Sequence, residues 1–191
     1  MVFPNKRLWP VLFLALGLSL GTAPGFVQAA TAQNSRPQSS VTVNPIGLAY
    51  GIANLEYEHL LGADTAGAAR VNFFSRGLGD FNANAIGFGA SYRWFAPLGT
   101  TEAAPRGLWY GPSVDYLQVN AKFAGDNSTS SFFQVSGDIG YKWILAETAN
   151  LVLSPFAQLG YMLGSLSVAN NNLDYGNRFV INVGLSVGLA F

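Results

Sequence analysis

The sequence has no cysteine, one histidine and few charged side chains. Without cysteine the chain can form no disulfide, no thiolate metal site and no lipoprotein anchor. Charged residues make up 10% of the chain and aromatic residues 14%, with 22 glycines, whereas charged residues are roughly 25% of an ordinary soluble protein. The composition is therefore too apolar for a disordered protein and too poor in charge for a typical soluble enzyme.

Long hydrophobic runs are also missing. The apolar run at residues 8–20 follows Lys6 and Arg7, and it is too short for a membrane helix of about 20 residues. With the small-x-small site Val27-Gln28-Ala29, or alternatively the site at residues 30–32, these features predict a signal peptide over residues 1–29. A retained anchor helix is the alternative. Residues 30–40 are polar and predict a flexible periplasmic lead-in.

Charge gives no sign of a nucleic-acid partner. The full chain has ten basic and ten acidic side chains, and removal of the signal peptide takes away Lys6 and Arg7. Eight basic side chains then face ten acidic ones, a net charge of −2. A nucleic-acid-binding protein would be expected to carry a basic surface instead.

The stretch at residues 177–191 has the clearest pattern in the chain. Every second residue from position 179 is large and apolar, and the last of them is Phe191. The residues between are polar or small, with Val180 the one exception. A period of two indicates a strand with different surroundings on its two faces. Its aromatic end favours a transmembrane strand with lipid on one side.

Seven further segments predict strands with the same alternation. They are residues 41–49, 51–61, 68–75, 83–95, 107–121, 132–145 and 150–166. Eight is an even number, as in single-chain bacterial barrels, and only a closed barrel pairs every backbone group of such strands in a membrane. The sequence therefore predicts an all-β fold over residues 41–191, an eight-stranded antiparallel up-and-down transmembrane β-barrel. The count depends on a turn near Tyr50-Gly51.

Finer features of the barrel also follow from the pattern. The alternation changes phase after Tyr116, which predicts a bulge, and Pro112 and Pro155 are expected at bulges because proline cannot donate to a ladder. Outward loops are expected at residues 76–82, 124–130 and 168–177. Aromatic residues should form two belts at the membrane interfaces. The inner belt comprises Tyr57, Tyr92, Trp94, Tyr110, Tyr141, Trp143 and Phe191, and the outer belt comprises Phe73, Phe74, Phe81, Phe123, Phe132 and Phe133.

Two parts of the chain resemble known proteins. The alternating last strand with terminal Phe191 resembles bacterial outer-membrane barrel proteins, which implies insertion into the outer membrane by the barrel-assembly machinery, with Phe191 as its signal. Residues 43–48 (VNPIGL) and 55–58 (LEYE) resemble the opening of an uncharacterised family of small bacterial outer-membrane barrels. That resemblance implies an OmpA-like transmembrane fold without the periplasmic domain of OmpA, and it brings no catalytic residues.

One predicted face carries four acids and four bases. A lumen of eight strands has room for side chains and little else, and unpaired charges there would cost several kcal/mol each. We therefore expect the charges to pair and fill the lumen; an ion path is the alternative. The expected network comprises Glu56, Glu58, Arg70, Arg93, Asp115, Asp138, Lys142 and Arg178.

Enzymatic chemistry finds little support in the sequence. His59 is the only histidine, so no second histidine can complete a zinc pair, and His59 is expected to face lipid. We predict no catalytic, metal or cofactor site. The expected function is that of an integral outer-membrane protein with a structural or surface-interaction role. A porin-like narrow pore or carrier of small molecules is the first alternative, and a lipid-modifying enzyme the second.

Overall fold

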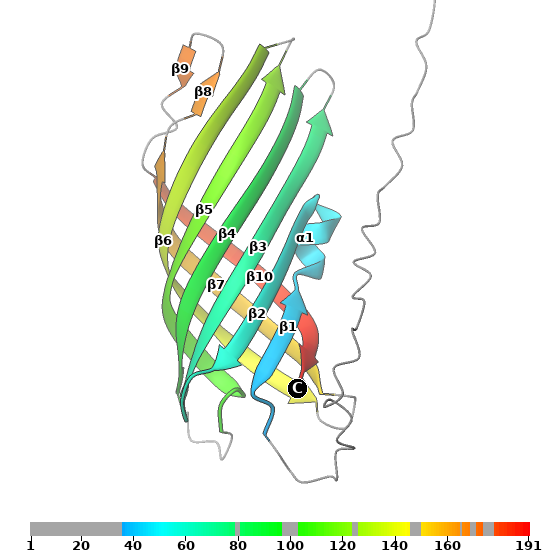
Figure 1. Ribbon diagram of the computed structural model, residues 1–191, viewed down its shortest axis with the longest axis vertical. Coiled ribbons are helices and arrows are strands. Elements are labelled where there is room, and N and C mark those ends of the chain that lie inside the picture. Colours follow the sequence, from blue (N-terminus) through cyan, green and yellow to red (C-terminus); the bar gives the residue numbers. More distant parts are fainter. Residues whose placement is uncertain are drawn as a thin grey trace, which may run out of the picture. The chain divides into compact units, whose positions relative to one another are not determined.

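The computed structural model describes residues 36–78, 81–96, 103–123, 126–145, 150–164, 166–168, 171–173 and 178–191, all within one compact unit, Arg36–Phe191. Eight strands close into one antiparallel barrel (Figure 1). Each strand pairs with the next barrel strand along the chain, and the first closes on the last. The eight-stranded antiparallel barrel predicted from the sequence is confirmed. The predicted signal peptide and most of the lead-in lie outside the described residues.

The strands are longer on one side of the barrel than the pattern indicated. Their bounds are β1 (Ser39–Val43), β2 (Ile52–Leu60), β3 (Thr65–Leu78), β4 (Phe81–Ala96), β5 (Gly107–Phe123), β6 (Asp126–Leu145), β7 (Leu151–Gly164) and β10 (Arg178–Ala190). Between β7 and β10, β8 (Leu166–Val168) and β9 (Asn171–Leu173) pair separately. We call the end where β1 begins and β10 finishes the terminus end, and the opposite end the hairpin end.

Strand extension at the hairpin end corrects two predicted loops. Much of residues 76–82 and 124–130 belongs to β3, β4 and β6. Outward side chains in this region are polar and bond across strands, as Ser75 Oγ does to Asn84 Oδ1 at 2.8 Å and Thr129 Oγ1 to Asn120 Oδ1 at 2.8 Å. The ladder thus continues where the apolar alternation stops, so the sequence pattern ended too early.

Residues 45–49 are the largest departure from the predicted strands. The segment forms a short helix, α1 (Pro45–Ala49), instead of the second half of a strand over residues 41–49. Asn44 caps this helix, its Oδ1 accepting from Gly47 N at 3.0 Å, and Pro45 occupies the first turn. Asn-Pro is a strong helix start, because asparagine accepts from the free N–H groups and proline presets φ.

The turn expected near Tyr50-Gly51 is present. Gly51 has φ +79° and its carbonyl accepts from Ser75 N at 3.1 Å. A Cβ at this position would lie 2.8 Å from Ser75 O. Glycine is therefore required here both for its backbone conformation and for its small size.

The expected bulges do not occur. Every barrel ladder keeps a constant register over its whole length, including β5 beyond Tyr116. At Pro112 the β4–β5 ladder skips two pairs and resumes, and at Pro155 the β6–β7 ladder does the same. Each proline stays paired on its other side, with Gly137 and Leu185 respectively. The missing donor therefore interrupts one ladder without inserting a residue.

The two faces of the wall have opposite chemistry. Lumenal positions include the buried Glu58, Arg93, Ser136 and Lys142, whereas outward positions carry large exposed apolar side chains. The exposed set includes Leu55, Phe88, Val114, Val135, Ile139, Leu159, Ile181 and Leu189. The predicted facing of the alternating residues is correct along β2, β4, β6 and β7.

Most aromatic residues lie outward at two levels. Near the terminus end, Tyr57, Tyr92, Trp94, Tyr110, Trp143 and Phe191 are exposed, and near the hairpin end Phe73, Phe88, Tyr116, Phe133, Tyr161 and Phe179 are exposed. The prediction that Phe132 belongs to the outer belt is wrong. Phe132 is buried and lies on the same lumenal face of β6 as Gln134. Phe74 shares the lumenal parity of Asn72 and is half-buried. The side chains of Phe81 and Phe123 lie outside the described residues.

Candidate functional site: the lumenal charge network

Apolar side chains close the lumen at the terminus end. Leu60, Ala66, Phe95, Ala104 and Trp109 form one buried cluster, and Ile144, Val152 and Ala190 form a second. The polar groups of the lumen lie beyond these clusters, toward the hairpin end. They therefore sit in surroundings that are dry on one side, where charge pairing matters most.

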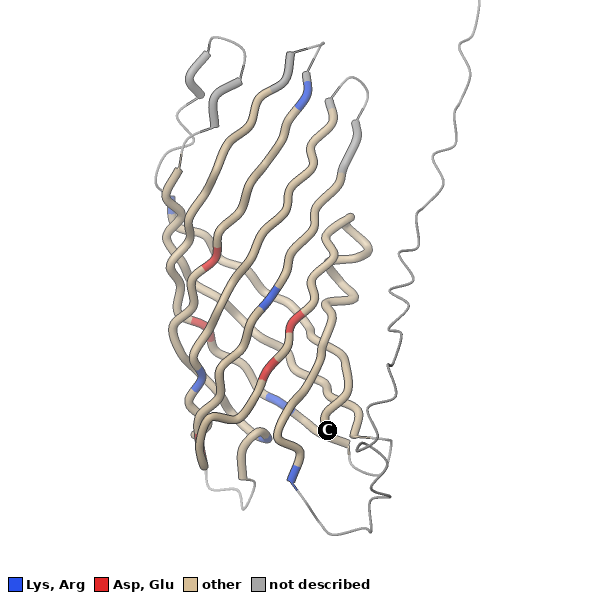
Figure 2. Tube along the Cα trace, in the orientation of Figure 1, with Lys and Arg blue, Asp and Glu red and all other residues tan. Residues whose placement is uncertain are grey.

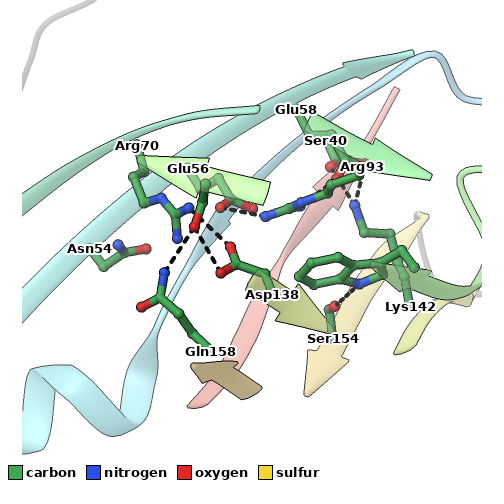
Figure 3. A network of polar contacts seen from close by, with 12 residues as sticks. Ser40, Asn54, Glu56, Glu58, Arg70, Arg93, Asp138, Lys142, Ser154 and Gln158 are labelled. Carbon is green, nitrogen blue, oxygen red and sulfur yellow. Dashed lines mark hydrogen bonds and ion pairs between the residues drawn. The ribbon is translucent and has the colours of Figure 1, made fainter. Parts of the chain in front are cut away.

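The first group of charges is a chain of two acids and two bases from β2, β4 and β6 (Figures 2 and 3). Arg93 Nη2 donates to Glu56 Oε2 at 2.7 Å, Arg93 Nη1 donates to Glu58 Oε2, and Lys142 Nζ donates to Glu58 Oε1. All four side chains are at most 11% exposed. Glu58 thus lies between two cations and the chain is neutral, which offsets part of the cost of burying each charge.

The side chain of Trp109 packs against this chain of charges. The Arg93 guanidinium lies over the Trp109 ring, 4.1 Å from its centroid. Trp109 Nε1 in turn donates to Ser154 Oγ at 3.2 Å. A guanidinium over an indole face is a favourable cation–π geometry. The same ring therefore fills the lumen and positions the arginine.

The second group links β3, β5 and β6. Arg70 Nη2 donates to Asp138 Oδ2 at 3.1 Å, and Ser113 Oγ donates to Asp138 Oδ1 at 2.8 Å. Arg70 Nε lies 3.2 Å from Asp115 Oδ1, an ion pair without hydrogen-bond geometry. A Cβ on Gly89 would lie 2.0 Å from Asp115 Oδ1. Glycine at this position makes room for the ion pair.

Amides continue the polar lumen toward the hairpin end. Gln158 Nε2 donates to Ser113 Oγ at 3.2 Å, and Asn182 Nδ2 donates to Gln158 Oε1 at 2.8 Å. Gln134 Nε2 donates to Ser136 Oγ at 2.8 Å. Gln158 and Asn182 thus join the second charge group through Ser113.

Little free space remains inside this layer. A cavity lined by residues from several strands, among them Glu56, Arg70, Arg93 and Asp138, offers ≈ 20 Å³ to the centres of water molecules. That volume holds about one or two waters. The Nε atoms of Arg70 and Arg93 are buried without a hydrogen-bond acceptor. The cavity is therefore small. Arg70 Nε still faces the Asp115 carboxylate in an ion pair, whereas Arg93 Nε has no hydrogen-bond acceptor among the described residues.

The structure brings seven of the eight predicted charges together in these two groups. Arg178, the eighth, is the first residue of β10, and its side chain is exposed at the hairpin end. The sequence interpretation overlooked Trp109 and Phe95 as lumenal residues. The period of two was a usable signal, because Trp109 lies on the same face of β5 as Ser113, and Phe95 on the same face of β4 as Arg93.

The remaining predicted positions lie at the terminus end. Phe191 is exposed, and its N–H donates to Ser39 O at 2.9 Å. His59 is exposed on the outer face, with Nδ1 2.8 Å from Ser39 Oγ. Among the described residues, no group of three or more histidine, cysteine, aspartate or glutamate side chains could hold a metal ion. The same residues include no helix of the length and apolarity that crossing a membrane requires.

Comparisons with protein-family models, with curated proteins and with solved structures found no match for this chain.

Proposed function

We propose that this protein is an integral outer-membrane protein whose barrel spans the bilayer and whose lumen is closed by paired charges, with a structural or surface-interaction role. The observation that carries the proposal is the polarity of the wall. Ion pairs and amides face inward, and large apolar side chains face outward on every long strand. A barrel in water would expose this apolar surface, whereas lipid is its natural solvent.

The height of the outward apolar band supports the same proposal. Phe133 and Trp143 are exposed on β6 and belong to the two aromatic levels. They are ten positions apart, which is about 34 Å along a strand and about 26 Å along the axis of a barrel with strands tilted about 40°. Membrane barrels have an apolar band about 25 Å tall. Beyond it, Gln118 and Asn120 on β5 face outward, as expected for strands leaving the bilayer.

The pairing of the lumenal charges favours a closed barrel over a pore. An ion path would need hydrated charges along a continuous channel. Here the cations of the described lumen contact carboxylates directly, and the cavity has room for about one or two waters. We propose that the hairpin end faces outward and that Phe191, exposed at the terminus end, serves the barrel-assembly machinery.

Heat-modifiable gel migration and fractionation test this function. A folded barrel extracted in detergent should migrate differently before and after boiling, and the protein should be found with the outer membrane. A Phe191→Ser variant should accumulate unassembled, whereas Phe179→Ser, which changes an even more exposed ring away from the terminus, should assemble. Migration unaffected by boiling, or recovery in the soluble fraction, would contradict the proposal.

A further inference from the structure

Four strands rise beyond the closed part of the barrel at the hairpin end. β2 begins at Ile52, opposite Phe74 of β3, and β7 ends at Gly164, opposite Phe132 of β6. Beyond these positions β3, β4, β5 and β6 continue and pair with one another in the barrel sheet (Figure 1). These four strands therefore extend past the level at which the described strands close the wall.

The wall reverses its polarity in this extension. Outward side chains there are polar, as in Asn84, Asn120 and Thr129, whereas nearer the terminus end the outward side chains are large and apolar. The described lumenal side chains are mostly apolar, with Ser128 and Ser130 as exceptions. We call the apolar lumenal residues the inner mouth face, and they include Phe74, Ala85, Leu117, Val119, Phe132 and Met162.

Several side chains of the inner mouth face remain partly exposed. Leu117 and Val119 are half-buried although their strand is paired on both sides, so their free surface lies inside the lumen. Phe74 and Met162 are half-buried as well. Neither buried apolar cluster of the described lumen includes a residue of this face. Apolar surface in contact with water is unfavourable, and a bound apolar molecule would remove it from water.

Uncharged groups separate the inner mouth face from the ion pairs. Along β3 the lumenal side chains change from Arg70 through Asn72 to Phe74, and β6 follows the same order from Asp138 to Phe132. The described side chains of the inner mouth face include no ionisable group. A charged molecule on this face would lose its hydration without gaining a counter-ion there. The face therefore favours an uncharged occupant.

We propose that the inner mouth face binds a small, uncharged, mainly hydrocarbon molecule that enters from the outward side of the membrane. The direction of entry rests on the orientation given under the proposed function. β4 presents only Ala83, Ala85 and Gly87 to the lumen at this level, which leaves width for such a molecule beside the rings of Phe74 and Phe132. The paired charges close the lumen below the site, so the molecule is bound and does not pass through.

A single introduced thiol tests the site, because the chain has no cysteine. Val119→Cys places the thiol on the inner mouth face, and Asn120→Cys places it one residue further on the exposed outward face. Each folded variant is placed in lipid nanodiscs, which leave both ends of the barrel open to water. Iodoacetamide is added, and the modified fraction is followed by mass spectrometry. Both thiols should react.

The probe is 1-octanol, and octanoate is its charged counterpart. At a 1-octanol concentration about ten times its dissociation constant, modification of Val119→Cys should slow about tenfold by mass action. Asn120→Cys should keep its rate, and octanoate at the same concentration should slow Val119→Cys far less. Adding Leu117→Asn to Val119→Cys should raise the 1-octanol concentration for half protection several-fold, whereas adding the outward Gln118→Asn should leave it unchanged.

The ligand site is overturned if Val119→Cys stays unmodified while Asn120→Cys reacts, which means that the chain itself covers the face. It is also overturned if 1-octanol slows neither thiol or both equally, if octanoate protects equally, or if Leu117→Asn acts as Gln118→Asn does. Heat-modifiable migration is measured on every variant. A barrel that migrates as folded but is not protected contradicts the ligand site alone, whereas loss of heat-modifiable migration in the parent protein contradicts the membrane barrel.

Discussion

Removal of Arg93 offers the sharpest test of the lumenal charge network. This guanidinium is the only one in the described lumen that contacts both Glu56 and Glu58, and its side chain is 4% exposed. In Arg93→Met the side chain keeps much of its volume and loses its charge. The change therefore isolates the electrostatic role of the arginine from its packing against Trp109.

The magnitude follows from what each carboxylate retains. Glu58 keeps Lys142 as a partner, whereas Glu56 loses its one ion pair among the described residues. A buried charge without its partner costs about 3–5 kcal/mol. We expect Arg93→Met to lower the free energy of unfolding by about that amount. Glu56→Gln alone leaves Arg93 paired with Glu58 and should cost about 1–3 kcal/mol.

Two double mutants separate pairing from general damage. Arg93→Met/Glu56→Gln removes the orphaned charge, so it should recover part of the loss, with a coupling of about 0.5–3 kcal/mol. Arg93→Met/Glu58→Gln should show no such recovery, because it leaves both Glu56 and Lys142 without an ion-pair partner among the described residues. Arg178→Met serves as the matched control at an exposed site and should cost less than about 1 kcal/mol.

Urea unfolding of these variants in liposomes, with conductance in planar bilayers, measures both outcomes. The reasoning is refuted if the single and double changes are additive and below about 1 kcal/mol, as expected for solvated charges. Ion conductance in the parent protein would then favour the pore, with hydrated lumenal charges. A large loss in Arg93→Met that neither double mutant recovers would assign the role of the arginine to its cation–π contact with Trp109 and not to its ion pairs.

Three further predictions concern other parts of the chain. Mass spectrometry of the membrane-extracted protein should find the mature N-terminus between residues 30 and 33; an intact Met1 would contradict this. Leu159→Arg should cost about 2–4 kcal/mol at the bilayer midplane, whereas Gln158→Arg should be milder in urea unfolding, because lumenal acids lie beside it; a reversed order would contradict the membrane placement. Gly51→Ala should cost about 1–2 kcal/mol from its positive φ alone, and an unchanged unfolding midpoint would contradict the strained turn.

The barrel could be predicted from the sequence because its strands obey a simple rule. In β6, Phe133 through Trp143 alternate with Gln134 through Lys142, and the wall has the same alternation of outward and lumenal faces. Polar strand ends escaped prediction because residues such as Thr129 and Ser131, which precede the predicted strand at 132–145, face outward in β6 without apolar character. A period of two in hydrophobicity arises where the two faces of a strand have different surroundings, so it disappears where both faces are polar.

The site was predictable only as a set of residues on one face. Sequence parity places Glu58, Arg93 and Lys142 inside a narrow barrel, yet it does not say that Glu58 lies between the two cations. Those contacts depend on the register between strands and on the reach of each side chain across the lumen. Trp109 was missed because a tryptophan in a membrane strand is usually taken to face lipid. Its spacing of four residues from the lumenal Ser113 places it on the inner face instead.

The lumenal charges connect β2 to strands on the far side of the barrel. Glu56 and Glu58 pair with Thr42 and Ser40 of β1, at the level where β1 still joins β2 to the wall. Through Arg93 and Lys142 these carboxylates connect β2 to β4 and β6 across the lumen. Beyond Val43 the pairing of β1 with β2 and β10 stops, and α1 begins at Pro45. The ion pairs hold β2 in place independently of α1, so Arg93→Met should destabilise the barrel far more than Asn44→Ala does.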